Sequence, residues 1–112
     1  MSKTDSILLL VSGSLREPNG LRSLDLANQF RLQGKKIGVY LLQNAVLGGV
    51  VEEAKILIEA QINSGIDFYC SEEDLTMRGL AEKDLHPQIH ISDYSYLIDL
   101  MMERYDKVIG AF

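Results

Sequence analysis

The sequence contains one cysteine, two prolines and no long apolar run, and each shortage excludes a class of protein. Because Cys70 is alone, it cannot form an internal disulfide, which predicts a reducing, cytoplasmic compartment. The apolar runs stay far below the roughly 20 residues that cross a bilayer, and the first of them is too short for a secretion signal, so no membrane association is expected. Since no repeat or low-complexity stretch marks a linker, we expect one domain over residues 1–112.

The chain is also short of positive charge. Its 11 Lys and Arg residues stand against 16 Asp and Glu residues, and the net charge is −5. No basic run is present that could displace counterions from phosphates, so nucleic acid is not an expected partner.

What the sequence does contain is a regular alternation of short apolar runs and helical patterns. The runs that predict buried strands are residues 7–11, 37–42, 66–69, 88–91 and 107–110. The capping and stop residues between them predict helices over residues 18–33, 50–64, 72–78 and 94–103. This alternation predicts an α/β fold of three layers, flavodoxin-like, with a five-stranded, mainly parallel sheet in the order 2-1-3-4-5 and helices on both faces.

Binding and catalytic sites in such sheets lie just beyond the carboxyl ends of the strands. Three segments meet that rule here: residues 12–19, residues 43–49 and the junction at Cys70. Cys70 ends the third apolar run and Ser71 follows as a helix N-cap, with Asp74 three positions on as an approximate capping box. The fold therefore places the only thiol at the edge of the sheet where chemistry is expected.

Two interpretations of Cys70 remain open. A thiol at a helix N-terminus faces unpaired N–H groups and the positive end of the helix dipole, which favour the reactive thiolate. The carboxylates of Glu72, Glu73 and Asp74 oppose a further negative charge, so we expect only modestly enhanced reactivity. The alternative is an inert cysteine that packs as a small hydrophobic residue.

Four other residues are candidate contacts for an anion or a partner. Ser12 and Ser14 belong to a small, hydroxyl-rich loop before a helix, a weak phosphate signal that lacks the rest of a P-loop. Arg78 stands beside the stop residue Gly79, where it also suits the helix C-terminus. Asn44 lies in the segment after the second strand.

The two histidines do not suggest a metal site. His86 and His90 are separated by Pro87 and the second lies in a predicted strand, so they do not share a helix face. We expect no metal and no cofactor. Tyr94, Tyr96, Met101 and Met102 are predicted to pack or to line an interface.

Taken together, these segments resemble the DsrE/DsrF/DsrH-like family of small, Tus-type sulfur-relay proteins. The matching stretches are ILLLV (residues 7–11), GLRSLDLA (20–27), LLQNAV (41–46), GIDFYC (65–70), MRGL (77–80) and YDKVI (105–109). The most specific element is a cysteine after the third strand with Arg-Gly eight and nine positions later. Two features depart from the family pattern: the acidic run after Cys70, and Asn44-Ala45 in place of Asp-Gly.

The resemblance implies that Cys70 accepts sulfane sulfur as a persulfide and passes it on. It also implies sulfur donor and acceptor proteins as partners, and assembly into a homo-oligomer, a trimer or a multiple of one. A non-catalytic oligomeric adaptor is the alternative. A third reading rests on residues 11–16, which resemble the phosphate-binding opening of flavodoxin-like flavin reductases, and it predicts a flavin phosphate at Ser12 to Ser14.

Overall fold

The computed structural model describes residues 5–110, and the expectations for residues 1–4 lie outside this range. The strands are β1 (Ser6–Val11), β2 (Lys36–Leu41), β3 (Asp67–Ser71), β4 (His90–Ser92) and β5 (Lys107–Ile109). The α-helices are α1 (Pro18–Leu32), α2 (Val51–Leu57), α3 (Glu59–Asn63), α4 (Glu72–Met77) and α5 (Tyr94–Asp99). The other elements of residues 5–110 are two 3₁₀ helices, η1 (Gln43–Gly49) and η2 (Glu82–Asp84), and a π-helical segment, η3 (Leu100–Arg104).

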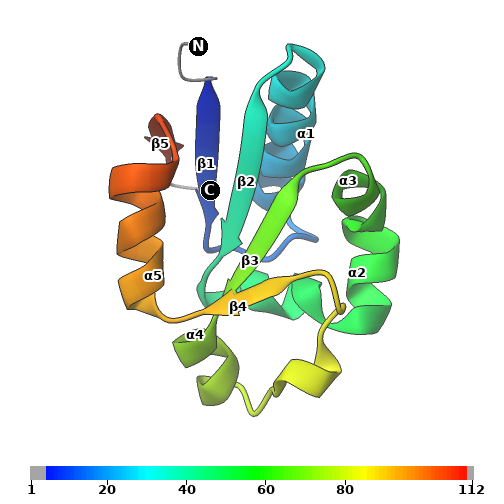
Figure 1. Cartoon of the computed structure of the whole chain (residues 1–112). Helices are drawn as coiled ribbons and strands as arrows, with labels where there is room; N and C mark the ends of the chain where they lie inside the picture. The colour runs from blue at the N-terminus through cyan, green and yellow to red at the C-terminus, as the bar shows by residue number, and fades with distance from the viewer. Residues whose placement is uncertain (1–4, 111–112) are drawn as a thin grey trace.

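The predicted α/β fold is confirmed. All five strands pair in parallel in one sheet, and helices lie on both of its faces (Figure 1). The apolar runs became strands because their side chains are buried on alternating faces: Ile7 and Leu9 point to one face and Leu8 to the other.

The predicted strand order, 2-1-3-4-5, is wrong. The sheet has the order β4-β3-β2-β1-β5, so β3 pairs with β2 and only β5 lies on the far side of β1. Apolar runs show that a strand is buried but not beside which neighbour. Here β2 is buried from Ile37 to Leu41 and so accepts a strand on each side. Three successive steps in one direction are followed by one long return from β4 to β5.

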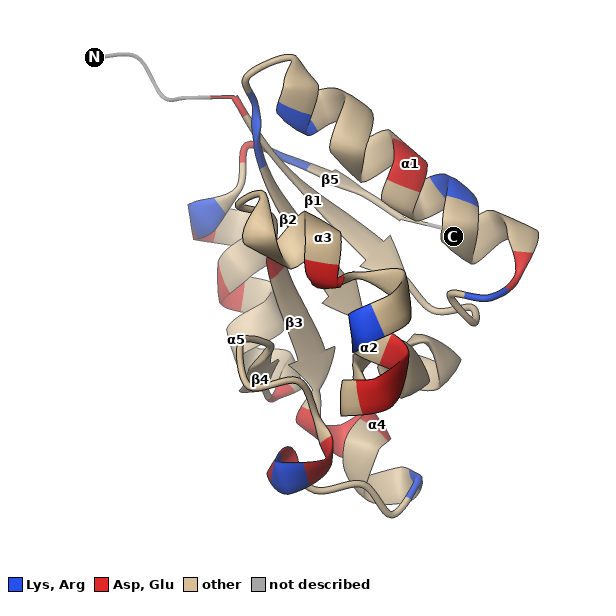
Figure 2. Ribbon diagram, turned by 90° about the vertical axis from the view of Figure 1, so that its right-hand side faces the viewer, with Lys and Arg blue, Asp and Glu red and all other residues tan. Residues whose placement is uncertain are grey.

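This topology sets the layers. Right-handed crossovers place the helices of the forward steps on one face and the helix of the return step on the other. Accordingly α1, α2 and α3 cover the first face, where Leu24, Ala27 and Ile58 are buried (Figures 1 and 2). On the second face α5 and η3 contribute Leu97 and Leu100 to a cluster with three tyrosines, Tyr40, Tyr69 and Tyr105.

Several predicted element ends are confirmed and two helices differ, of which the one predicted over residues 94–103 is divided into α5 and the π-helical η3. Pro18 begins α1, Gly34 follows its end with a φ of 87°, and the Asp93 side chain caps α5 by accepting from the Tyr96 N–H at 2.9 Å. The helix predicted over residues 50–64 is divided into α2 and α3. The break is at Ile58, whose φ of −132° departs from helical geometry while its side chain is fully buried in the core.

Charged residues of both signs lie on α1 and α2, whereas the first turn of α4 is wholly acidic. Figure 2 shows Lys and Arg residues scattered along α1, β2 and α2, and acidic residues on α2 and α4. Within the described residues, no helix is long and apolar enough to cross a membrane.

Candidate functional site

The carboxyl edge of the sheet brings together the segments that were predicted to carry a site. Leu41 pairs with Cys70 and Cys70 pairs with Ile91, so the ends of β2, β3 and β4 lie side by side. As predicted, α4 begins directly after β3, and the Ser71 hydroxyl accepts from the Asp74 N–H at 3.2 Å.

The Cys70 thiol is buried in the core of the first face. Cys70 has 0% exposure. A Cβ placed on Gly49 would lie 3.0 Å from the Cys70 sulfur, and the same Cβ would also contact Ile89 and Leu85. Burial raises the pKa of the Cys70 thiol to about 12. In this conformation burial, which disfavours the thiolate, opposes the helix N-terminus, which favours it, and the modestly enhanced reactivity of Cys70 stays a prediction.

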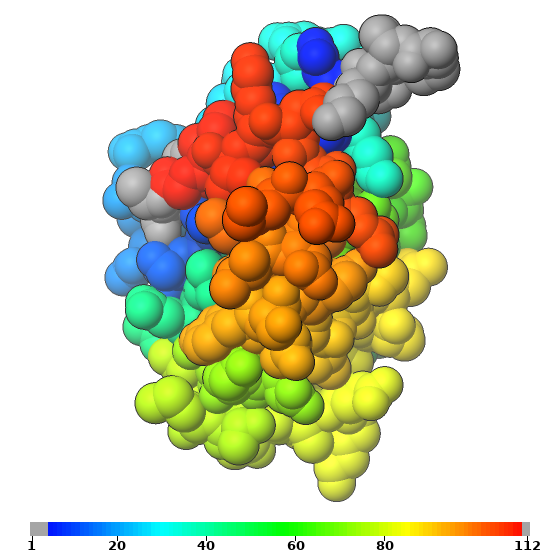
Figure 3. Space-filling view, turned by 60° about the vertical axis from the view of Figure 1, so that its left-hand side comes forward, coloured from blue at the N-terminus to red at the C-terminus, as the bar shows by residue number. Residues whose placement is uncertain are grey.

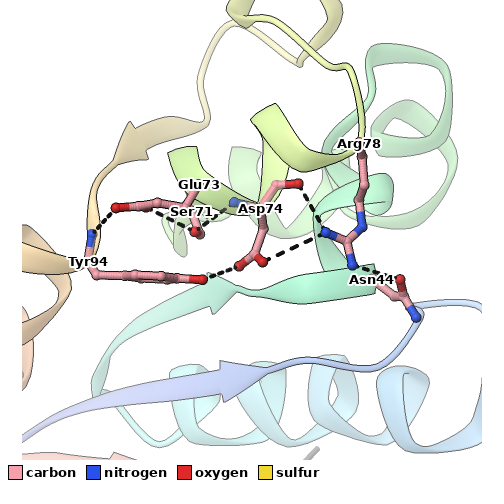
Figure 4. Close-up of polar contacts among 6 residues, drawn as sticks. All are labelled: Asn44, Ser71, Glu73, Asp74, Arg78 and Tyr94. Atoms are coloured by element: carbon pink, nitrogen blue, oxygen red, sulfur yellow. Dashed lines mark hydrogen bonds and ion pairs between the residues drawn. The ribbon is translucent and has the colours of Figure 1, made fainter.

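A polar network around Asp74 occupies the same edge of the sheet (Figure 4). The carboxylate is only 4% exposed and accepts from the Tyr94 hydroxyl at 2.9 Å. Burial disfavours its charge. Hydrogen bonds from the Gln43 backbone, Tyr94 and Ser71, together with the charge of Arg78, nevertheless hold the pKa of Asp74 below its usual range. Asp74 is thus a buried anion with partners from η1, β3, α4 and α5.

Arg78 and Asn44 were both predicted as candidate contacts for an anion or a partner, and the structure joins them. The Arg78 guanidinium donates to the Asn44 side-chain oxygen at 3.0 Å and to the Asp74 carbonyl at 3.1 Å. It also lies 3.7 Å from the Asp74 carboxylate. These contacts make Arg78 a link between α4 and η1, while Gly79, with a φ of 71°, ends the helix beside it.

The hydroxyl-rich loop forms a separate group. The Ser14 hydroxyl accepts from the Arg16 N–H at 3.2 Å, and the Arg16 guanidinium pairs with Glu53 of α2 at 2.7 and 2.9 Å. Leu15 is buried against Gly48, so the loop is anchored in the core. Ser12 follows β1 at the same edge.

This loop does not fit a flavin phosphate. Pro18, the first residue of α1, has no N–H to donate, and the N-cap residue Glu17 brings a carboxylate to the helix start. Both features disfavour an anion at the position where a phosphate would have to bind.

The histidines lie in different environments. His86 is buried and its Nδ1 accepts from the Gln88 N–H at 3.2 Å. His90 is exposed, with its ring 5.2 Å from the Tyr69 ring. Over residues 5–110, no group of three His, Cys, Asp or Glu side chains has the arrangement of a metal site.

Sequence reasoning missed the two residues that complete the Asp74 network, Tyr94 through its side chain and Gln43 through its backbone N–H. The Tyr94 N–H donates to Glu73 at 3.2 Å and its hydroxyl reaches Asp74, so Tyr94 connects α5 to α4. Gln43 has a φ of 50°, rare for a residue with a side chain, and its N–H faces Asp74. The only local signal was an Asp, in place of Glu or Gln, as the third residue after the Ser71 cap.

Comparisons with known proteins agree with this architecture. The structure is similar to the crystal structure of the ychN protein from E. coli, with a TM-score of 0.84 and 19% identity, covering 96% of this chain and 100% of that chain. It is also similar to MTH1491, a protein of unknown function from Methanobacterium thermoautotrophicum, with a TM-score of 0.72 and 14% identity, covering 97% and 100%. These likenesses show the fold.

Among curated proteins, no sequence matches. A family model described as DsrH like protein matches residues 20–108, which include β2, β3 and the Cys70–Arg78 segment. The chain therefore belongs to the DsrH-like family.

Proposed function

We propose that this chain is a subunit of a sulfur-relay assembly that acts through its contacts with other proteins and not through its own thiol. Its partners are further copies of the chain, in a trimer or a multiple of one, and the sulfur donor and acceptor proteins of the relay. Membership of the DsrH-like family supports the sulfur-relay context.

The burial of Cys70 carries the choice of an adaptor over a carrier. A sulfur-accepting cysteine must reach a donor protein and must ionise to attack. Cys70 has no exposed surface, and burial raises the pKa of its thiol to about 12, which keeps the thiol protonated at pH 7. Both conditions are unmet in this conformation.

A second candidate function is that of a persulfide carrier, with Cys70 as the acceptor. Its position favours this function, since Cys70 lies at the carboxyl end of β3 beneath Gly49 of η1. Displacement of η1 would uncover the sulfur. The thiolate would then attack the outer sulfur of a donor persulfide, forming a new S–S bond on Cys70. The donor cysteine would leave as a thiolate and take up the proton that Cys70 released.

Intact mass spectrometry separates the two functions. The native chain is incubated with inorganic polysulfide, and in parallel with iodoacetamide, with and without urea. The adaptor function predicts no one-sulfur adduct and alkylation only in urea. A one-sulfur adduct on the native chain that is absent from Cys70→Ala would overturn the adaptor function and establish the carrier.

A second measurement tests the sulfur-relay context itself. The tagged chain is mixed with the sulfur-relay proteins encoded by the same genome, and both wild type and Cys70→Ala are expected to retain the same partners. Binding that depends on Cys70 would contradict the adaptor function, and binding of none of them would contradict the relay role.

A further inference from the structure

A cavity of about 540 Å³ lies on the second face of the sheet, beside the outer strand β4. Its volume falls within the range of about 300–1,000 Å³ that is typical of ligand sites. The aromatic and polar residues of its lining come from β3, α4, β4 and the start of α5, and they are Tyr69, Glu72, His90, Ser92, Asp93 and Tyr96. None of them takes part in the Asp74 network, so the cavity is a separate site.

The cavity adjoins an open edge of the sheet. Figure 3 shows the orange surface of α5 next to the yellow-green surface of α4, and the cavity lies where these two segments meet β4. Because β4 is the last strand of the sheet, no further strand of residues 5–110 covers its outer edge (Figure 1). A ligand in the cavity can therefore extend along β4.

Three rings contribute to the lining. The ring centres of Tyr69 and His90 lie 5.2 Å apart, and on its other side Tyr69 stacks on Tyr40 of β2 at 5.8 Å, which holds the Tyr69 ring in place. The Tyr96 ring already contacts a guanidinium within the chain, since Cζ of Arg104 lies 5.8 Å from its centre. Aromatic rings attract cations in this way, and arginine is the most frequent partner.

Two carboxylates complete the lining. Asp93 accepts from the Tyr96 N–H through Oδ1, while its Oδ2 and the carboxylate of Glu72 have no hydrogen-bond or ion-pair partner among residues 5–110. No Lys or Arg of these residues lines the cavity, and Glu73 follows Glu72 on the same acidic turn of α4. The charges at the cavity therefore favour a cation and disfavour an anion.

We propose that this cavity binds the guanidinium group of an arginine that a partner protein presents in an extended segment along β4. The inference rests on the proposed function, in which the chain acts through contacts with other proteins, and it names the chemistry of one such contact.

A guanidinium matches both parts of the lining. Its planar face stacks on aromatic rings while its edge donates paired N–H bonds to a carboxylate, whereas an ammonium is a compact charge that is more strongly hydrated. The open edge of β4 offers backbone N–H and C=O groups to an extended segment, which is how peptides add to the edge of a sheet. The net charge of −5 also favours the approach of a basic partner.

NMR titration of the isotope-labelled full chain tests the site, at pH 8, where histidine side chains are mostly neutral. A five-residue peptide with a central arginine is expected to bind with a Kd of about 1 mM or below, and to shift the ring signals of Tyr69, His90 and Tyr96. The same peptide with lysine should bind at least about threefold more weakly. The peptide with citrulline, which has nearly the same shape but no charge, should bind at least about tenfold more weakly.

Paired carboxylate variants separate the cavity from a general attraction to an acidic protein. Glu72→Gln combined with Asp93→Asn removes both charges, keeps an Asn that can cap α5, and should raise the Kd of the arginine peptide at least about fivefold. Asp25→Asn combined with Glu52→Gln is the matched control, because these exposed side chains lie on α1 and α2 over the first face. It changes the net charge equally and should bind the peptide as wild type does. The dispersion of the amide signals verifies that both double variants are folded.

Free L-arginine tests whether the arginine belongs to a polypeptide. Its own carboxylate would be repelled by Glu72 and Asp93, and it lacks the segment along β4, so it should bind more weakly than the peptide. The guanidinium site is overturned by no saturable shift at about 10 mM arginine peptide, by equal binding of lysine, citrulline or free L-arginine, or by an unchanged Kd in the Glu72 and Asp93 double variant. Each of these results leaves the adaptor function standing, because the alkylation of Cys70 and the binding of relay proteins decide it independently.

Discussion

Replacing Asp74 by Asn tests how far the carboxyl edge depends on one buried charge. The carboxylate accepts hydrogen bonds from the Tyr94 hydroxyl and the Gln43 N–H, and it lies beside the Arg78 guanidinium. Asn is nearly the same size but carries no charge, and its amide nitrogen would face donors. Hydrogen bonds to a buried charge contribute about 1.5–3 kcal/mol, so we expect Asp74→Asn to lower the free energy of unfolding by about 2 kcal/mol.

The pH dependence of this loss has a defined sign. The native pKa of Asp74 is lowered, so its stabilising effect is fully present above its unfolded pKa of about 4 and is lost as pH falls through the native pKa. The stability difference between wild type and Asp74→Asn should be constant from pH 5 to 7. It should shrink progressively below about pH 4, because the wild-type carboxyl is then neutralised as well.

Urea denaturation followed by far-UV circular dichroism measures both effects. Asp25→Asn on α1 is the control, because its side chain is exposed, and it should match wild type. Tyr94→Phe removes one of the donors and should cost about 1 kcal/mol, with a smaller cost in the Asp74→Asn background. A difference below about 0.5 kcal/mol at pH 7, or one that is equally large at pH 3, would refute the assignment of Asp74 as a buried, stabilising anion.

Two further predictions concern the core. Gly49→Ala should destabilise the fold by about 1 kcal/mol, because the new methyl group would lie 3.0 Å from the Cys70 sulfur and 3.2 Å from Ile89. The loss of stability should be smaller in a Cys70→Ala background, and equal losses in both backgrounds by urea denaturation would contradict the packing. Burial raises the pKa of Tyr40 to about 12, and its hydroxyl contacts the Ser92 hydroxyl at 2.5 Å. Tyr40→Phe should therefore leave the tyrosinate absorbance of the folded chain at pH 11 nearly unchanged, and a clear loss of absorbance would show that Tyr40 ionises at lower pH.

Local sequence signals located the elements and the edge of the sheet well. Pro18 and Gly34 bound a helix by the conformations they allow, and Ser71 capped α4 as its position indicated. These signals act within a few residues of the chain, so they can be interpreted without knowing which distant segments lie beside them. The strand order depends on contacts between distant segments, and nothing in the apolar run of β3 distinguishes β1 from β2 as its neighbour.

The chemistry of Cys70 was harder to predict because it depends on the face to which the side chain points. Alternation along β3 puts Phe68 and Cys70 on one face and Tyr69 on the other. A cysteine that shares a face with Phe68 beneath a three-helix layer is packed in the core, even though its backbone reaches the expected site. The partners of Asp74 could not be predicted from the sequence either, since Gln43 and Tyr94 are distant from Asp74 along the chain.

The position of β5 has a consequence for how the chain is made. β1 pairs with β2 on one side and with β5 on the other, and about a hundred residues separate β1 from β5. At a synthesis rate of about 5–20 residues per second, one edge of β1 keeps its backbone N–H and C=O groups unpaired for roughly 5–20 s before β5 has been made. The Ile7–Leu9 backbone is then free to pair with another nascent chain, and only the arrival of Lys107–Ile109 closes that edge.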